Sequence, residues 1–222
     1  MLSPISARTP NGLRVLDLFC CQGGAAMGYH LAGFDVTGVD LAPQPRYPFA
    51  FVQGDALAYL AARGTEYDLV HASPPCQRYT NAQRIQHREH PDLVAPLRDL
   101  LEATGRPYVI ENVPGAPLLD AVELCGSMFG LRTYRHRLFE ASFPLGRSHH
   151  PRHLAPNAKM GRPVRDGEFM HIVGNFSNVP LARQVMGMPW ATRDGLREAV
   201  PPAYTAHIAA QFLACTPTAV AA

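Results

Sequence analysis

The chain has 222 residues, of which 47% are hydrophobic and 17% charged, and its formal net charge is +2. This length suits one domain with a full-sized core. No apolar run approaches the ~18 residues of a membrane span, and the polar N-terminus has no signal-peptide core. These features predict a protein without a membrane partner. We expect one cytoplasmic domain over residues 1–222, acting as a monomer, and the charge alone does not indicate a nucleic-acid partner.

The basic residues and the cysteines each leave alternatives open. Of the 20 basic side chains only Lys159 is a lysine. An excess of arginine is typical both of a GC-rich genome and of phosphate recognition by the guanidinium group. The five cysteines are an odd set without CxxC spacing, which argues against a disulfide framework or a structural zinc site. Most of them are expected to be buried structural thiols.

Apolar runs alternate with helical patterns from residue 14 to about residue 143. The pattern predicts strands at 14–19, 35–40, 50–52, 67–72, 107–113 and 134–143, and helices near 24–32, 56–63 and 91–104. Such alternation predicts an α/β fold with a doubly wound, mostly parallel sheet. Residues 144–167 break the pattern as an irregular, basic insertion. A strand-like segment at 168–174 and helices at 181–186 and 202–214 are expected to follow it.

The first predicted strand runs into a glycine turn and a helix. Gly23 and Gly24 would let the backbone approach a ligand, and the helix N-terminus favours an anionic group. Asp40 ends the next strand, where a carboxylate accepts hydrogen bonds from ribose hydroxyls. Asp55 ends the third strand and is placed to accept from an adenine amino group. The pattern predicts an adenosine-containing cofactor, and NAD would fit it as well.

A second group of residues follows the fourth and fifth predicted strands. Pro74 and Pro75 stiffen the backbone ahead of Cys76 at the edge of the sheet where ligands bind. Cys76 alone fits a buried structural thiol better than a nucleophile. Glu111 changes this balance, because an acid among apolar residues has either a buried partner or a raised pKa. Arg135 and Arg137 alternate, so on a strand they would share one face, which a solvated surface also explains.

The runs DLFCCQGG, GVD, GDA, SPPCQ, IENV and TYRHRLFE occur in the order seen in DNA cytosine-5 methyltransferases. The chain resembles this family over roughly residues 14–143 and again near 180–214. It looks like the short, phage-type members, whose tail carries segments like GMPW and PPAYT. The resemblance implies the Rossmann-like methyltransferase fold, S-adenosyl-L-methionine as cofactor with S-adenosyl-L-homocysteine as product, DNA as partner, and a role in restriction–modification.

The resemblance also implies a role for each motif residue. The Cys76 thiolate would add to carbon 6 of cytosine, protonated Glu111 would relieve charge at ring nitrogen 3, and Arg137 would hold the base carbonyl with support from Arg135. Because carbon 6 is inaccessible inside a duplex, the base must be flipped out. The implied cofactor contacts are Phe19, Gln22, Gly23, Gly24, Asp40, Leu41, Asp55, Ala56 and Pro75. The implied substrate contacts are Ser73, Gln77 and Asn112.

The chain departs from the family pattern in several places. Cys21 stands where the family usually has glycine, and Thr133 stands where it has glutamine. The closing motif appears only as the sequence EAVP at 198–201. A large recognition domain is replaced by residues 144–167, which we interpret as a reduced target-recognition region with short or relaxed specificity. Its phosphate contacts are predicted to be Arg147, Arg152, Lys159, Arg162 and Arg165.

Two questions remain open on the sequence. His149, His150 and His153 lack a nearby cysteine in zinc-site spacing, so no metal site is predicted. The missing recognition domain keeps open the same chemistry on RNA or on a free cytidine nucleotide. A non-catalytic DNA-binding remnant is the third interpretation, against which the presence of both Cys76 and Glu111 argues.

Overall fold

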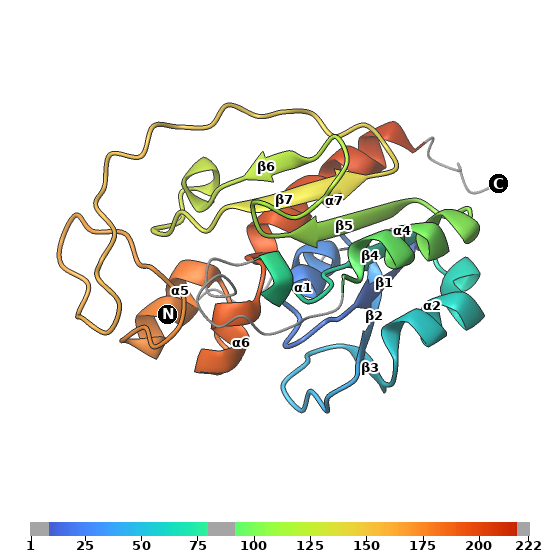
Figure 1. Cartoon of the computed structure of the whole chain (residues 1–222), viewed down its shortest axis with the longest axis horizontal. Helices are drawn as coiled ribbons and strands as arrows, with labels where there is room; N and C mark the ends of the chain where they lie inside the picture. The colour runs from blue at the N-terminus through green and yellow to red at the C-terminus, as the bar shows by residue number, and fades with distance from the viewer. Residues whose placement is uncertain (1–8, 80–91, 217–222) are drawn as a thin grey trace.

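A seven-stranded sheet with strand order β3-β2-β1-β4-β5-β7-β6 forms the centre of the molecule (Figure 1). The computed structural model describes residues 9–79 and 92–216, except for the side chain of Gln77. The strands are β1 (Arg14–Leu18), β2 (Asp35–Asp40), β3 (Ala50–Gln53), β4 (Leu69–Ala72), β5 (Tyr108–Asn112), β6 (Val122–Leu124) and β7 (Arg137–Ala141).

The sheet is mostly parallel. Strands β1 to β5 pair in parallel, whereas β7 is antiparallel to both β5 and β6. The helices are α1 (Gly24–Leu31), α2 (Ala56–Arg63), α4 (Val94–Ala103), α5 (Val179–Met186), α6 (Arg193–Glu198) and α7 (Pro202–Cys215), with 3₁₀ turns η1 (Gly64–Glu66), η2 (Gln77–Tyr79) and η3 (Gly126–Phe129). This architecture confirms the predicted doubly wound α/β sheet.

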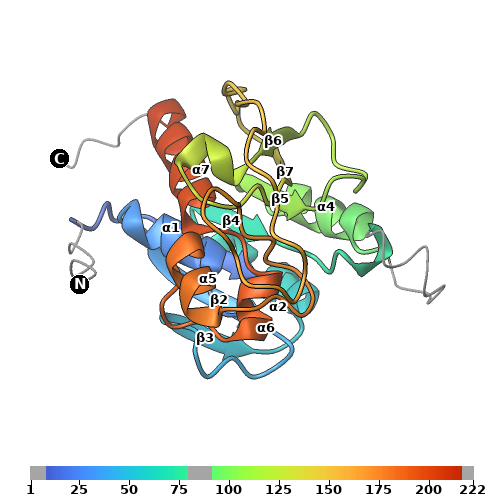
Figure 2. The ribbon, with the colours of Figure 1, turned by 90° about the vertical axis from the view of Figure 1, so that its left-hand side faces the viewer.

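Helices cover both faces of the sheet, as Figure 2 shows. Successive side chains of a strand point to opposite faces. Accordingly Val15 and Val109 pack with α1 and α7 in one cluster, and Leu16 and Ile110 pack with α2 and α4 in another. Because both faces are buried, the carboxyl ends of the strands are left as the exposed edge where a ligand would bind.

Helices α1 and α7 pack against each other at close range. The Thr205 hydroxyl donates a hydrogen bond to the Ala25 carbonyl at 2.8 Å, and a side chain at Gly28 would overlap Thr205 and the Pro202 carbonyl. Gly28 therefore allows the close approach of α1 and α7, and this contact holds α7 against the rest of the fold.

A long segment without helix or strand leads from β7 to α5, and Figure 1 shows it passing around one end of the molecule. The predicted strand at 168–174 is wrong, because its pairing is limited to one bridge between Asn157 and Phe169. The predicted strand at 134–143 is shortened to β7. The sequence patterns missed β6 and α6, both of which are too short to show a clear period.

No helix within residues 9–79 and 92–216 combines the length and the apolar character that crossing a bilayer requires.

Gly28→Ala is expected to destabilise the fold by about 1–3 kcal/mol, because the added methyl group forces α1 and α7 apart. Urea unfolding measures this loss. Gly54→Ala is the matched control: a methyl group there meets no atom, so its effect should stay within about 0.5 kcal/mol. Equal stability of the two variants would contradict this account of the packing.

Candidate active site

One cavity of about 440 Å³ opens at the carboxyl edge of the sheet. Ends of β1, β2, β4 and β5 line it, together with the start of α2 and the segment between α6 and α7. The predicted cofactor, catalytic and substrate residues found in its wall are Phe19, Gly24, Asp40, Leu41, Asp55, Ala56, Ser73, Pro75, Cys76, Glu111 and Arg137. The fold thus brings both groups of motif residues to one place.

The turn after β1 is tightly wound. Phe19 and Cys21 have positive φ angles of 58° and 45°, and Gly23 has a φ of 77°. The first two conformations are uncommon for residues with side chains. Cys21, which departs from the family glycine, therefore occupies a conformation that favours glycine. At Gly24 a side chain would overlap the Val200 carbonyl, so the tail closes directly over the turn.

Two backbone amides hold the Asp40 carboxylate in place at the cavity. Its Oδ2 accepts a hydrogen bond from the Cys21 amide at 2.9 Å, and its Oδ1 accepts one from the Ala42 amide at 3.0 Å. Each carboxylate oxygen has two lone pairs, so both can still accept a hydroxyl. Leu41 beside it is 75% exposed and offers a flat apolar surface. Asp55 caps α2 by accepting from the Ala58 amide at 2.8 Å.

Asp17 is a wall residue that the sequence reasoning did not select. It is 1% exposed and lines the cavity, and its Oδ1 has no hydrogen-bond partner among the described residues. Tyr47 donates a hydrogen bond of 3.4 Å to Oδ2. Burial raises the pKa of Asp17 to about 8. The sequence signal was an acid in an otherwise apolar strand, the same signal that Glu111 gave.

Glu111 is buried beside Arg137, whose Nε lies 2.9 Å from the Glu111 Oε1. Burial raises the pKa of Glu111 above its ordinary value, against the opposing influence of Arg137 and the Ser73 hydroxyl. The Ser73 hydroxyl lies 3.1 Å from the His71 Nε2, and the His71 Nδ1 lies 3.0 Å from the Tyr29 hydroxyl. Burial lowers the pKa of His71 to about 3, so the imidazole is neutral. Glu111 thus has a protein environment that favours a retained proton.

Cys76 stands at the entrance to η2, where its carbonyl accepts a hydrogen bond from the Tyr79 amide at 2.9 Å. Burial raises the pKa of the Cys76 thiol, whereas the positive charge of Arg137 lowers it. The thiolate is the nucleophilic form. Arg137 therefore favours the reactive form of Cys76 and also stabilises the charged form of Glu111.

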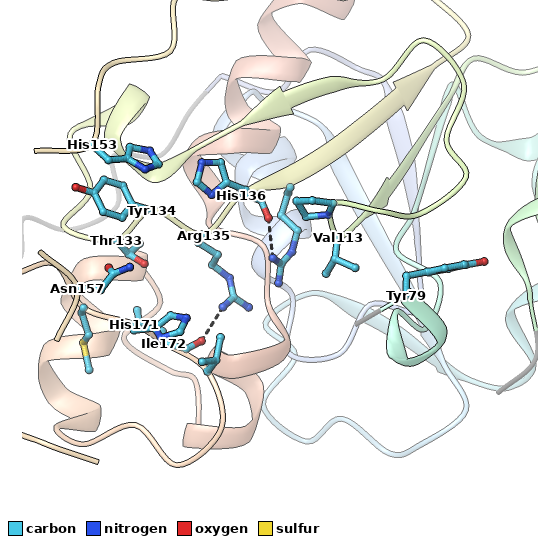
Figure 3. A pocket seen from close by; sticks show the side chains of 14 residues that line it. Tyr79, Val113, Thr133, Tyr134, Arg135, His136, His153, Asn157, His171 and Ile172 are labelled. Carbon is cyan, nitrogen blue, oxygen red and sulfur yellow. Dashed lines mark hydrogen bonds between the residues drawn. The ribbon is translucent and has the colours of Figure 1, made fainter. Parts of the chain in front are cut away.

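Arg135 does not share the position of Arg137, which corrects the prediction that both lie on one strand face. Strand β7 begins at Arg137, and Arg135 precedes it with a φ of 34°. Its guanidinium donates to the carbonyls of Ile172, Arg197 and Ala199 at 2.7–2.8 Å. Figure 3 shows the bond to Ile172. Arg135 is therefore a positioning residue that joins three segments of irregular backbone.

A second cavity of about 480 Å³ adjoins the first, and Arg137 and Val113 line both. Figure 3 shows its wall, with Arg135, His171 and Ile172 on one side and Tyr79 on another. Thr133, the departure from the family glutamine, also belongs to this wall. Arg137 therefore lies between two hollows. The first is lined by the cofactor motifs, Cys76 and Glu111, and the second mainly by residues 133–137 and 170–173.

Two predicted contacts point away from the first cavity. The Gln22 side-chain amide donates to the Thr192 hydroxyl at 2.9 Å, and its oxygen accepts from the Thr192 amide at 2.9 Å. The Asn112 amide donates to the Pro74 carbonyl at 3.1 Å. Both side chains bind loops and neither lines the first cavity, and their roles in cofactor and substrate binding stay predictions. The Gln77 side chain lies outside the described residues.

Gly23 is turned toward the Tyr47 ring instead of the cavity. Arg147 forms an exposed ion pair with Asp120 at 2.8 Å and lines a different hollow, and its phosphate contact stays a prediction. The remaining predicted phosphate contacts are exposed and, in the described part of the chain, line neither of the two cavities: Arg152, Lys159, Arg162 and Arg165.

No family model and no curated protein matches the chain. Among solved structures it is similar to the Dnmt2 methyltransferase of S. pombe (20% identity, TM-score 0.44, 58% of this chain and 48% of that one). It is also similar to a mutant of Spodoptera frugiperda DNMT2 (17%, 0.46, 62% and 54%) and to an RNA methyltransferase from Salinibacter ruber in complex with S-adenosyl-L-homocysteine (17%, 0.38, 67% and 90%). The chain spans about half the length of the two Dnmt2 proteins. At these levels the likeness carries no argument about function.

Alkylation of Cys76 by iodoacetamide is expected to rise with pH and to reach its midpoint above the ordinary thiol value, because burial raises the pKa. Arg137→Ala removes the charge that lowers this pKa, so the midpoint should move to still higher pH. Arg137→Lys keeps the charge and is the matched control. Peptide-resolved mass spectrometry measures the rate at each pH, and an unchanged midpoint in Arg137→Ala would contradict the electrostatic coupling.

Proposed function

We propose that this protein transfers a methyl group from S-adenosylmethionine to carbon 5 of cytosine in DNA. The observation that carries the proposal is the shared cavity: Cys76, Glu111 and Arg137 line the same space as Asp40 and the turn after β1. A nucleophile, a carboxyl with a raised pKa and a fixed cation are the three groups that this reaction requires of the protein.

The cofactor residues fit an adenosine-containing sulfonium compound. Asp40 offers acceptors for two ribose hydroxyls, Leu41 offers an apolar surface for the adenine ring, and Asp55 lies on the same wall. The unpaired Oδ1 of Asp17 leaves a buried polar atom for a ligand to satisfy. When bound, S-adenosylmethionine supplies an electrophilic methyl group. The sequence has no P-loop lysine motif, which argues against a nucleoside triphosphate as the ligand.

The chain's own residues would act on the base in order. The Cys76 thiolate forms a bond to carbon 6, and the electrons of the carbon 5–carbon 6 double bond move toward ring nitrogen 3. The Glu111 carboxyl holds a proton at that nitrogen, which makes carbon 5 nucleophilic. Arg137 fixes the base and stabilises the thiolate. After methylation the carbon 5 proton passes to water, the carbon 5–carbon 6 double bond forms again, Cys76 leaves as the thiolate, and ring nitrogen 3 returns its proton to Glu111.

DNA is supported by the position of the second cavity. It adjoins the first at Arg137 and opens beside the basic segment 144–167. A base turned out of a duplex would enter through this side, with exposed cations of the segment near the phosphates. So short a segment reads few bases, which supports relaxed specificity.

Duplex DNA containing 5-fluorocytosine is expected to become covalently attached to the protein in the presence of S-adenosylmethionine, because after methyl transfer carbon 5 carries fluorine in place of the proton whose loss releases Cys76. Gel mobility under denaturing conditions detects the adduct. Cys76→Ser should abolish it, and Glu111→Gln should slow it by about 10²–10⁴-fold. Cys215→Ser, which removes an exposed cysteine, is the control that should react normally.

Transfer of a labelled methyl group from S-adenosylmethionine distinguishes duplex DNA, RNA and free cytidine nucleotide as substrates. Label in duplex DNA supports the proposal. Label only in RNA or in free cytidine nucleotide, with no label in DNA, would leave the chemistry intact but overturn DNA as the substrate. Tight DNA binding without adduct or label would support a non-catalytic remnant.

Asp40→Ala is expected to weaken S-adenosylmethionine binding by about 10–100-fold, because hydrogen bonds to a charged acceptor are lost. Isothermal titration calorimetry measures the affinity. Asp35→Ala is the matched control, since Asp35 is exposed at the opposite end of the same strand. Loss of affinity in both variants, or in neither, would contradict the assigned ribose contact; urea unfolding checks that Asp40→Ala remains folded.

A further inference from the structure

Four possible metal ligands lie close together near the start of β7. Cys125 precedes η3, His136 precedes β7, and His150 and His153 belong to the segment 144–167. One ligand atom from each lies within 4.8 Å of all the others. The sequence spacing gave no cysteine near the histidines, but the fold places Cys125 among them. Figure 3 shows His136 and His153 with Tyr134 close by.

The distances between ligand atoms suit one tetrahedral ion. The Nε2 atoms of His136 and His150 are 3.2 Å apart, and the Cys125 Sγ lies 3.4 Å from the His153 Nε2. Two nitrogens at about 2.0–2.1 Å from zinc and at the tetrahedral angle are about 3.4 Å apart, and a sulfur–nitrogen pair is about 3.6 Å apart. These two pairs are therefore already spaced for a small divalent cation, and all four ligand atoms lie within 4.8 Å of one another.

Neighbouring groups orient the imidazoles. The His150 Nδ1 lies 2.9 Å from the Pro151 carbonyl, so it carries the proton and leaves the Nε2 lone pair directed at the cluster. The Tyr134 ring stacks on His153 with centroids 3.6 Å apart. The Ser127 hydroxyl lies 3.1 Å from the Cys125 Sγ and can donate to it. Such outer contacts accompany metal ligands and fix their geometry.

The donor set indicates which ion is bound. Three imidazoles and one thiolate are nitrogen and sulfur ligands in a four-coordinate arrangement, which selects zinc over magnesium or calcium. Four protein ligands leave no open position, so the site would be structural and not catalytic. Binding would form the zinc–sulfur bond and release the Cys125 thiol proton to solvent.

We propose that Cys125, His136, His150 and His153 bind one Zn²⁺ ion, which fastens the segment 144–167 to the start of β7. His136 stands between Arg135 and Arg137, so the ion would hold the basic segment beside both arginines. This role is separate from methyl transfer and does not depend on it.

Metal analysis of the purified full chain tests the site directly. Inductively coupled plasma mass spectrometry should find about one zinc ion per chain. Replacement by Co²⁺ should give visible absorption bands of a tetrahedral ion and a near-ultraviolet band from thiolate to cobalt. Cys125→Ser should abolish the thiolate band and His150→Ala the stoichiometric metal. His149→Ala and Cys215→Ser are matched controls, both exposed, and should bind as the wild type does.

Removal of the metal tests the fastening. A chelator should increase proteolytic cleavage within residues 144–167 by roughly tenfold or more, and added Zn²⁺ should reverse this, since an ion that binds the ordered state stabilises it. Folded wild-type protein without stoichiometric zinc, or a cobalt complex without a thiolate band, would overturn the proposal. Both tests use the wild type, so they stand even if a variant fails to fold.

Discussion

The buried ion pair between Glu111 and Arg137 is the contact on which the site depends. It joins β5 to the antiparallel strand β7, and its members are 8% and 14% exposed. Loss of one partner from such a pair leaves an uncompensated buried charge and costs about 3–5 kcal/mol. Arg137 lines both cavities, and Glu111 lines the first. Burial favours a neutral Glu111, and Arg137 opposes this, so the proton on Glu111 is held in a balance that a bound base would shift.

Arg135, unlike Arg137, holds irregular backbone segments together. Irregular backbone leaves carbonyl groups that need hydrogen-bond donors, and a guanidinium supplies five in a fixed plane. Arg135 directs them to three carbonyls from the 168–174 segment, α6 and the following turn. Residues 170–173 of the first of these segments form part of the wall of the second cavity. The Arg135 side chain thus supplies hydrogen bonds to backbone carbonyls that have no strand partner.

The sequence predicted the parallel part of the fold well, because its signals are local. The alternation of apolar runs and helices located β2 and α2 at their observed bounds, and the edge of the sheet then brought Asp40, Cys76 and Glu111 together. Side-chain direction was harder to predict. Gln22 and Asn112 lie in the expected motifs, yet tertiary partners that are remote in sequence draw both away from the cavity. Asp17 was overlooked although it carries the signal that identified Glu111.

The segment 144–167 shows why an irregular region needs cross-links. Of these residues, all of which the structure describes, only Ala158 is buried, so little apolar burial offsets the roughly 1–2 kcal/mol per residue that ordering the backbone costs. Order must come from a few strong contacts. Tyr134 stacked on His153, the Tyr134 hydroxyl bonded to the Ala155 carbonyl at 2.7 Å, and the proposed zinc ligands all act near one point. Because that point adjoins Arg135 and Arg137, anything that loosens the segment also disturbs the two arginines beside the candidate active site.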